Sequence, residues 1–176
     1  MSITINLSKI RNNEGTSLSF NLQTEKLDLL AKEDLLITKP LQIWVEVKNT
    51  GNILQLQGEV ETEVTTNCDR CLEKVILPIK TNFKEKLIHT SNLKLLHYLT
   101  KDEIEEEYVV FDKDNFDLTD FVRESIILAI PLKILCAENC RGFCPKCGQN
   151  LNRSSCNCTT DEIDPRLAIL AKLKRD

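Results

Sequence analysis

Eight cysteines, spaced as four close pairs, restrict the possible folds of this chain more than any other feature. The pairs, numbered here from first to fourth, are Cys68 and Cys71, Cys136 and Cys140, Cys144 and Cys147, and Cys156 and Cys158. A tight C-x2-C turn directs two thiolates at one point, and two cysteine pairs supply the four tetrahedral ligands that structural Zn²⁺ prefers. The sequence therefore predicts two closed zinc sites with four cysteine ligands each.

The redox compartment decides between metal binding and disulfides. The first residues, MSITINLSKIRNN, contain no basic stretch leading into a continuous apolar segment, so we expect no secretory signal. No apolar run approaches the roughly 20 residues that are needed to cross a bilayer. We therefore expect a cytoplasmic protein without a membrane segment, in which thiols stay reduced. Disulfides are the alternative, but a dense cysteine pattern in a reducing compartment favours metal.

The spacing of the pairs also predicts how they are grouped. The third pair is a zinc knuckle, because Gly148 directly after it permits the positive φ that closes the turn under the metal. The fourth pair lies one short loop away and can reach the same ion, which leaves the first and second pairs to share the other ion. An alternative grouping joins the first pair with the third, as in an ordinary zinc ribbon with a long insertion.

Alternation of apolar and polar residues predicts strands in the first two thirds of the chain. Residues 41–47 alternate up to a turn at 49–52, and residues 53–66 resume the pattern, so the two segments are expected to pair as a long hairpin. A third strand is expected from Lys74 to Leu87 and a short one over 108–111. We expect Trp44 to lie in the core and the acidic run 102–107 to be a solvated loop.

Helical spacing replaces this alternation over residues 115–130, with Asp117 or Thr119 as a cap and Pro131 at the end, and a last helix is expected from Asp164. The fold class is therefore α+β: a twisted antiparallel sheet with one packing helix and a C-terminal zinc-stabilised module ending in a helix. We expect residues 1–132 to form the main core. Residues 133–176 would be the cysteine-rich module, tied to the core through the turn at 68–71.

Several classes of enzyme are disfavoured by the residues. A catalytic zinc keeps an open position beside His or carboxylate ligands, and the only histidines, His89 and His97, lie away from the cysteines in the sequence. A redox C-x-x-C motif would open a helix in a βαβ unit, which neither C-x2-C pair does. The chain also has no phosphate-binding or nucleophile-elbow motif. We therefore expect no enzymatic activity.

Charge is unevenly distributed along the chain. Residues 1–132 carry 15 Lys and Arg against 22 Asp and Glu, whereas residues 133–176 carry 8 against 5. Eight coordinated thiolates and two Zn²⁺ ions would take the net charge from −4 to −8. Non-specific binding to a phosphate backbone is therefore disfavoured, and any RNA contact should be local. The candidates are Arg70, Arg141, Lys146 and Arg153, whose alternative role is solubility.

Four segments, taken together, resemble the YceD family. They are Cys68-Asp-Arg-Cys-Leu-Glu73, the stretch from Asp117 to Pro131, Cys140-Arg-Gly-Phe-Cys-Pro-Lys-Cys-Gly-Gln-Asn-Leu-Asn152, and Asp164-Pro-Arg-Leu-Ala168. The resemblance implies a non-catalytic factor required for the accumulation of large-subunit (23S) ribosomal RNA and for large ribosomal subunit biogenesis. Its partner would be a subunit precursor, through ribosomal RNA or a ribosomal protein. A protein-binding adaptor and a thiol redox sensor are the alternatives.

Overall fold

A computed structural model of the chain describes residues 2–25, 27–29 and 35–158. The strands are β1 (Thr4–Asn6), β2 (Ser17–Thr24), β3 (Leu36–Ile37), β4 (Leu41–Asn49), β5 (Leu54–Asn67), β6 (Lys74–His89), β7 (Val109–Phe111) and β8 (Asn115–Asp117). The helices are α1 (Ser8–Arg11), the 3-10 helix η1 (Thr90–Leu96), α2 (Lys101–Glu107) and α3 (Thr119–Ala129). The chain divides into two compact units. The sheet unit comprises residues up to 66 and 75–132, and the cysteine unit comprises 67–74 and the described residues from 133 onward.

The sheet unit is built on strands in the order β2-β4-β5-β6-β7, with β3 added beside β5. β4 and β5 form the long hairpin that the alternation predicts, with Asn49 opposite Leu54. β7, however, runs parallel to β6, with Leu87 opposite Val109. The sheet is therefore mixed, and the prediction of a purely antiparallel sheet is wrong at this edge. The connection through η1 and α2 is long enough for the crossover that parallel pairing needs.

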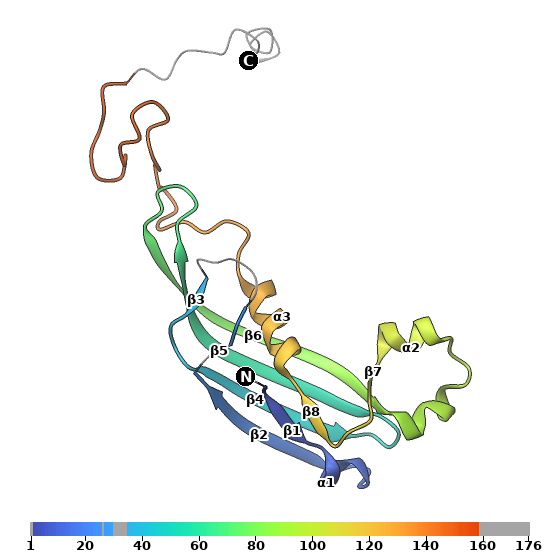
Figure 1. Ribbon diagram of the computed structural model, residues 1–176. Helices are drawn as coiled ribbons and strands as arrows, with labels where there is room; N and C mark the ends of the chain where they lie inside the picture. Colours follow the sequence, from blue (N-terminus) through green and yellow to red (C-terminus); the bar gives the residue numbers. More distant parts are fainter. Residues whose placement is uncertain (1, 26, 30–34, 159–176) are drawn as a thin grey trace. The chain divides into compact units, whose positions relative to one another are not determined.

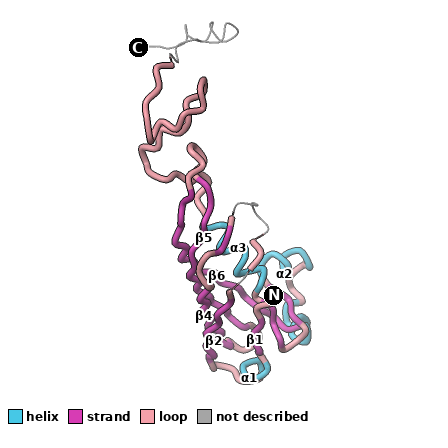
Figure 2. The backbone as a smooth tube through the Cα atoms, turned by 60° about the vertical axis from the view of Figure 1, so that its left-hand side comes forward, coloured by secondary structure: helices cyan, strands magenta, loops and turns pink. Residues whose placement is uncertain are grey.

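One face of this sheet carries the core. Figures 1 and 2 show α3 and the two-stranded sheet of β1 and β8 lying against the same face. β4 turns every second side chain towards them, so that Ile43, Val45 and Val47 are buried. Val122 and Ile126 of α3 are fully buried from the other side. Burying each such side chain stabilises the fold by roughly 1.5–3 kcal/mol before the entropy of ordering is counted.

Two local predictions are wrong, each for an identifiable reason. Trp44 follows Ile43 in a strand whose odd-numbered residues point into the core, so it lies on the opposite face and is 40% exposed. The acidic run forms helix α2 because Thr100 and Glu103 make a capping box. The Thr100 hydroxyl accepts a hydrogen bond from the N–H of Glu103 at 3.3 Å, and the Glu103 carboxylate accepts one from the N–H of Thr100 at 2.7 Å.

Helix α3 begins later than the helical spacing suggests. Residues 115–117 pair with β1 as β8, and the helix itself starts at Thr119. Asp117 acts near the helix start as expected, because its carboxylate accepts a hydrogen bond from the N–H of Thr119 at 2.8 Å. The last helix predicted from the sequence, beginning at Asp164, lies outside the described residues. No helix in the described part of the chain is long and apolar enough to span a membrane.

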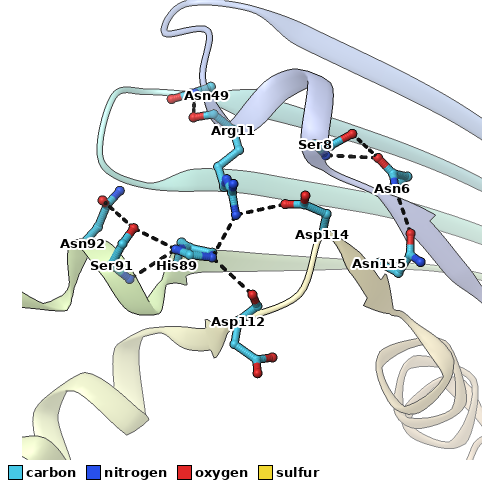
Figure 3. A network of polar contacts seen from close by, with 10 residues as sticks. All are labelled: Asn6, Ser8, Arg11, Asn49, His89, Ser91, Asn92, Asp112, Asp114 and Asn115. Carbon is cyan, nitrogen blue, oxygen red and sulfur yellow. Dashed lines mark hydrogen bonds and ion pairs between the residues drawn. The ribbon is translucent and has the colours of Figure 1, made fainter.

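A polar network joins the end of α1 to the end of β6 (Figure 3). Nη1 of Arg11 lies 2.9 Å from Nε2 of His89 and 2.9 Å from a carboxylate oxygen of Asp114. Nδ1 of His89 lies 2.7 Å from the Ser91 hydroxyl at the start of η1. The Asn49 side chain donates a hydrogen bond to the carbonyl oxygen of Arg11 at 3.1 Å. His89 therefore positions secondary structure, and it belongs to neither cysteine group.

Candidate metal centres

The first and second cysteine pairs meet at the turn that joins β5 to β6. Cys68 and Cys71 lie on this turn, and Cys136 and Cys140 lie on the loop that follows α3. All four Sγ atoms lie within 4.8 Å of one another. The Sγ atoms of Cys68 and Cys140 are 3.8 Å apart, and those of Cys71 and Cys136 are 3.5 Å apart. All four residues belong to the cysteine unit.

These separations fit a single bound metal ion. A disulfide brings its two sulfur atoms to about 2.05 Å, far closer than any pair here. Four thiolates placed about 2.3 Å from a tetrahedral zinc lie about 3.8 Å from one another. The observed separations of 3.5 and 3.8 Å agree with the second geometry. Because all four described members of the group are cysteines, a metal ion held here would have the closed ligand set that is typical of structural zinc.

Backbone contacts close the turn that carries the first pair. Leu72 adopts a left-handed conformation with φ of 58° and donates a hydrogen bond from its N–H to the carbonyl of Cys68 at 3.0 Å. The N–H of Asp69 donates to the carbonyl of Ile134 at 2.8 Å, and the N–H of Ile134 donates to the Asp69 carboxylate at 2.6 Å. The turn between two strands is thereby held to the loop that carries the second pair.

The thiols of this group differ in acidity. Burial raises the pKa of Cys68, but hydrogen bonds from backbone N–H groups, with that of Arg70 the strongest, outweigh it and lower this pKa to about 6. The neighbouring thiols of Cys71 and Cys140 raise the pKa of Cys136 to about 12. A second thiolate beside the first is therefore disfavoured by like charge. A divalent cation removes that penalty and allows all four sulfurs to lose their protons.

The third and fourth pairs form the second group. The Sγ atoms of Cys144, Cys147, Cys156 and Cys158 lie within 4.8 Å of one another. The knuckle closes through Gly148, whose φ is 71° and whose N–H donates a hydrogen bond to the carbonyl of Cys144 at 2.9 Å. This is the positive φ that the sequence predicts at that glycine.

Acidity in the second group follows the same pattern as in the first. Backbone N–H groups of Cys147 and Lys146 hydrogen-bond the Cys144 sulfur and lower its pKa to about 6. The thiol of Cys147 raises the pKa of Cys158 to about 12. Each group therefore has at least one thiol that ionises readily and another that needs a cation beside it.

The observed groups join the first pair with the second and the third with the fourth. This is the grouping expected from the spacing, and the zinc-ribbon alternative, which joins the first pair with the third, does not form. The cysteine unit also contains a residue that the sequence analysis did not single out. Asn152 donates a hydrogen bond to the sulfur of Cys140 at 3.3 Å and lowers the pKa of that thiol. It also accepts one from the N–H of Arg141 at 2.8 Å, so it links the two groups.

The basic candidates differ in their surroundings. Arg70 donates a hydrogen bond to the carbonyl of Cys140 at 2.6 Å, and Arg153 forms an ion pair with Glu73 at 2.9 Å. Both side chains therefore help to hold the cysteine unit together. Lys146 and Arg141 lie on exposed positions of the same unit. Phe143 follows Arg141 after one glycine in the sequence and is 40% exposed.

Comparisons with known proteins cover both cysteine groups. The family model described as large ribosomal RNA subunit accumulation protein YceD matches residues 56–174. The chain is 28% identical over 156 residues to the chloroplastic large ribosomal RNA subunit accumulation protein YCED homolog 1 of Arabidopsis thaliana, covering 77% of this chain and 49% of the relative. It is 32% identical over 135 residues to the uncharacterized protein YlbN of Bacillus subtilis (strain 168), covering 73% of each. 

A Zea mays protein with the same name as the Arabidopsis one is 30% identical over 154 residues, covering 68% of this chain and 48% of the relative. The chain therefore spans about half the length of these two chloroplastic relatives. No solved structure matches the chain.

Proposed function

The chain belongs to the YceD family, and on this premise we propose that it is a non-catalytic factor required for accumulation of 23S ribosomal RNA and for large ribosomal subunit biogenesis. The observation that supports this most is the family match over residues 56–174, which includes all eight cysteines. Two relatives carry accumulation of the large ribosomal RNA subunit in their names.

Two structural Zn²⁺ ions are part of this proposal. Each cysteine group offers four thiolates at tetrahedral spacing, and neither contains a His or carboxylate that would leave an exchangeable position. The described residues around the groups hold the turn and the loops in place. The zinc ions would therefore shape the cysteine unit, and the absence of an open ligand position supports a role without catalysis.

RNA contact would be local and would centre on the exposed residues Arg141 and Phe143. An exposed arginine two residues from an exposed aromatic ring suits an unpaired nucleotide, because a guanidinium binds phosphate and a ring stacks on a base. Arg70, Arg153 and Lys146 would add positive charge around this position. The second candidate function is a protein-binding adaptor without RNA contact, which the net charge of −4 favours. A thiol redox sensor instead requires metal-free, oxidisable cysteines.

The test uses cells that lack the endogenous protein and carry the wild-type chain, the double variant Arg141→Ala and Phe143→Ala, or neither. The expected result is a lower ratio of 23S to 16S ribosomal RNA in the variant, measured together with the protein's metal content. The matched control is Lys48→Ala, which removes one exposed charge from the sheet unit. An unchanged ratio in cells without the protein would overturn the ribosomal role.

Binding to RNA fragments separates direct contact from the adaptor alternative. The affinity of the wild-type chain should fall steeply with salt, and Arg141→Ala should reduce the slope of log affinity against log salt by about 0.7. Ultraviolet crosslinking followed by sequencing would identify the RNA segment. If only proteins are captured and the slope is flat, the adaptor function is supported. The cytoplasmic location expected from the sequence stays a prediction, since two relatives are named as chloroplastic.

A further inference from the structure

Strand β6 has an open edge along most of its length. On one side it lies beside β5, and on the other β7 pairs only with Leu87–His89. Within residues 2–25, 27–29 and 35–158, no strand pairs with the stretch 75–86 on that second side. Pro78 is consistent with an edge position, because proline has no N–H to donate to a ladder. The open edge therefore offers a row of backbone donors and acceptors for a further strand.

A groove of about 330 Å³ runs along this edge in the sheet unit. It is lined by five consecutive residues of β6, 81–85, and by the side of α3 that includes Leu128 and Ala129. These five residues lie within the stretch 75–86 that has no strand partner on its second side. The phenylalanine rings of Phe83 and Phe121, with centroids 6.4 Å apart, line it from the two elements. The groove is thus bounded by a strand edge and a helix.

Two carboxylates and one lysine, Lys84, line the groove, so its charged side chains are acidic on balance. Glu85 of β6 and Glu124 of α3 both line it, and no described residue forms an ion pair with either. Both carboxylates line the same groove, and burial together with the charge of Glu124 raises the pKa of Glu85, as expected for like charges that repel each other. A cationic side chain entering the groove would relieve that repulsion.

The helical wall adds an apolar contact. Leu128 is 85% exposed, although it lies on a helix whose other face packs in the core. Its neighbour Ala129 is small enough to leave room beside it. An apolar side chain placed against Leu128 would remove this surface from water, with a gain of roughly 25 cal/mol per Å² of apolar area buried.

From the open edge, the paired carboxylates and the exposed leucine, we propose that this groove binds an extended basic segment of a partner protein, which adds to β6 as a further strand. The peptide backbone would hydrogen-bond the free edge, a Lys or Arg side chain would lie between Glu85 and Glu124, and an apolar side chain would cover Leu128. Glu85 and Glu124 outnumber Lys84 in the lining, and their negative charge disfavours RNA phosphate at this position. A second copy pairing edge to edge would bring in a second Pro78 and a second pair of carboxylates. The inference concerns the sheet unit and does not depend on the RNA contact proposed for the cysteine unit.

The proposed peptide binding can be tested by selection from a displayed library of random peptides. A selected peptide is then synthesised, and its affinity and its effect on amide hydrogen exchange of the protein are measured. The enriched peptides should alternate in polarity and carry Lys or Arg. Binding should slow exchange of amides within 81–86 and should weaken at least about tenfold in the Glu85→Gln and Glu124→Gln double variant. The matched control is Glu46→Gln, an exposed carboxylate on the opposite face of the sheet, which should leave affinity unchanged.

Thermal melting distinguishes the loss of a binding site from unfolding of the double variant. Because the variant removes two carboxylates that repel each other, the melting temperature of its sheet unit should be unchanged or raised. The proposal fails if the library yields no enriched sequence, if acidic or purely apolar peptides are enriched, or if exchange slows elsewhere. It also fails if light scattering shows a dimer that the double variant dissociates, since the groove would then bind a second copy.

Discussion

The sheet unit and the cysteine unit bury different kinds of residue. The contiguous apolar core, which includes Leu41, Val60, Leu87 and Ile126, lies entirely within the sheet unit. In the described part of the cysteine unit, the buried residues are Ile134, Gly142, Cys68, Cys71, Cys140 and Cys144. One unit therefore has its own hydrophobic driving force, and the other has cysteine sulfur in the place of a core.

Polar contacts do not compensate for the missing apolar core in the cysteine unit. The ion pair between Arg153 and Glu73 is largely exposed, and exposed pairs contribute about 0–1 kcal/mol. The hydrogen bonds between Asp69 and Ile134 hold two loops together but bury little apolar surface. A bound zinc ion contributes on the order of 10 kcal/mol of apparent folding free energy. If the proposed metal ions are bound, metal coordination and apolar burial would stabilise separate parts of one short chain.

Metal removal should produce the largest difference in stability between the two units. A strong chelator is expected to remove the ions and unfold the cysteine unit, with a loss on the order of 10 kcal/mol per site, because little else orders it. Amide hydrogen exchange should accelerate in residues 67–74 and 136–158, while the core strands β4 and β5 stay protected. Unchanged protection over 136–158 after complete metal removal would contradict the division.

Removing one cysteine pair should show which cysteines share a metal ion within the cysteine unit. The double variant Cys156→Ser and Cys158→Ser should lose one metal ion and keep the other, because the remaining group has all four of its ligands. Elemental analysis by mass spectrometry measures the ratio of metal to protein. The matched control, Cys68→Ser with Cys71→Ser, should lose the other ion. Retention of two ions by the first variant would show that the grouping is wrong.

A packing change in the sheet unit should lower its stability and leave the metal content intact. Gly58 lies under the ring of Phe83, and a Cβ added there would come within 2.2 Å of the Phe83 Cζ atom. Gly58→Ala should therefore cost about 1–3 kcal/mol in urea unfolding, although alanine is normally favoured over glycine in a strand. The double variant with Phe83→Leu should recover part of the loss. A neutral or stabilising Gly58→Ala would show that the ring moves aside freely.

The sequence predicts the metal groups better than it predicts the sheet's edges. Cysteine spacing limits which sulfurs can reach one point, so the two groups could be anticipated without tertiary information. The hairpin of β4 and β5 could be anticipated because the alternation is regular on both sides of the turn. The parallel pairing of β7 with β6 could not be anticipated, because a strand of three residues does not indicate whether it will pair parallel or antiparallel.

Other differences could have been recognised from the residues. The phase of Ile43 and Val45 already places Trp44 on the opposite face of β4. The sequence Thr100-Lys-Asp-Glu103 is a capping box, which marks the start of a helix in an acidic run. Asn152 is different, because its hydrogen bond to the Cys140 sulfur depends on how the two cysteine groups are arranged. Contacts of that kind follow from tertiary structure and have no local signal.

The smallest predicted effect depends on pH and belongs to the sheet unit alone. Burial raises the pKa of Asp117, but hydrogen bonds from the side chain and N–H of Thr119 and from Ser2 outweigh it and lower the pKa below 3.8. Because the folded-state pKa lies below the unfolded one, the stabilisation is present above pH 3.8 and is lost as the pH falls through the folded-state value. Asp117→Asn should therefore cost about 0.5–1 kcal/mol at pH 7 and less below about pH 4.

The control is Asp112→Asn, whose side chain makes no such contact with a described residue. A cost that stays constant with pH would show that the Asp117 charge does not stabilise the start of α3. A change in metal content would show instead that the two units are coupled.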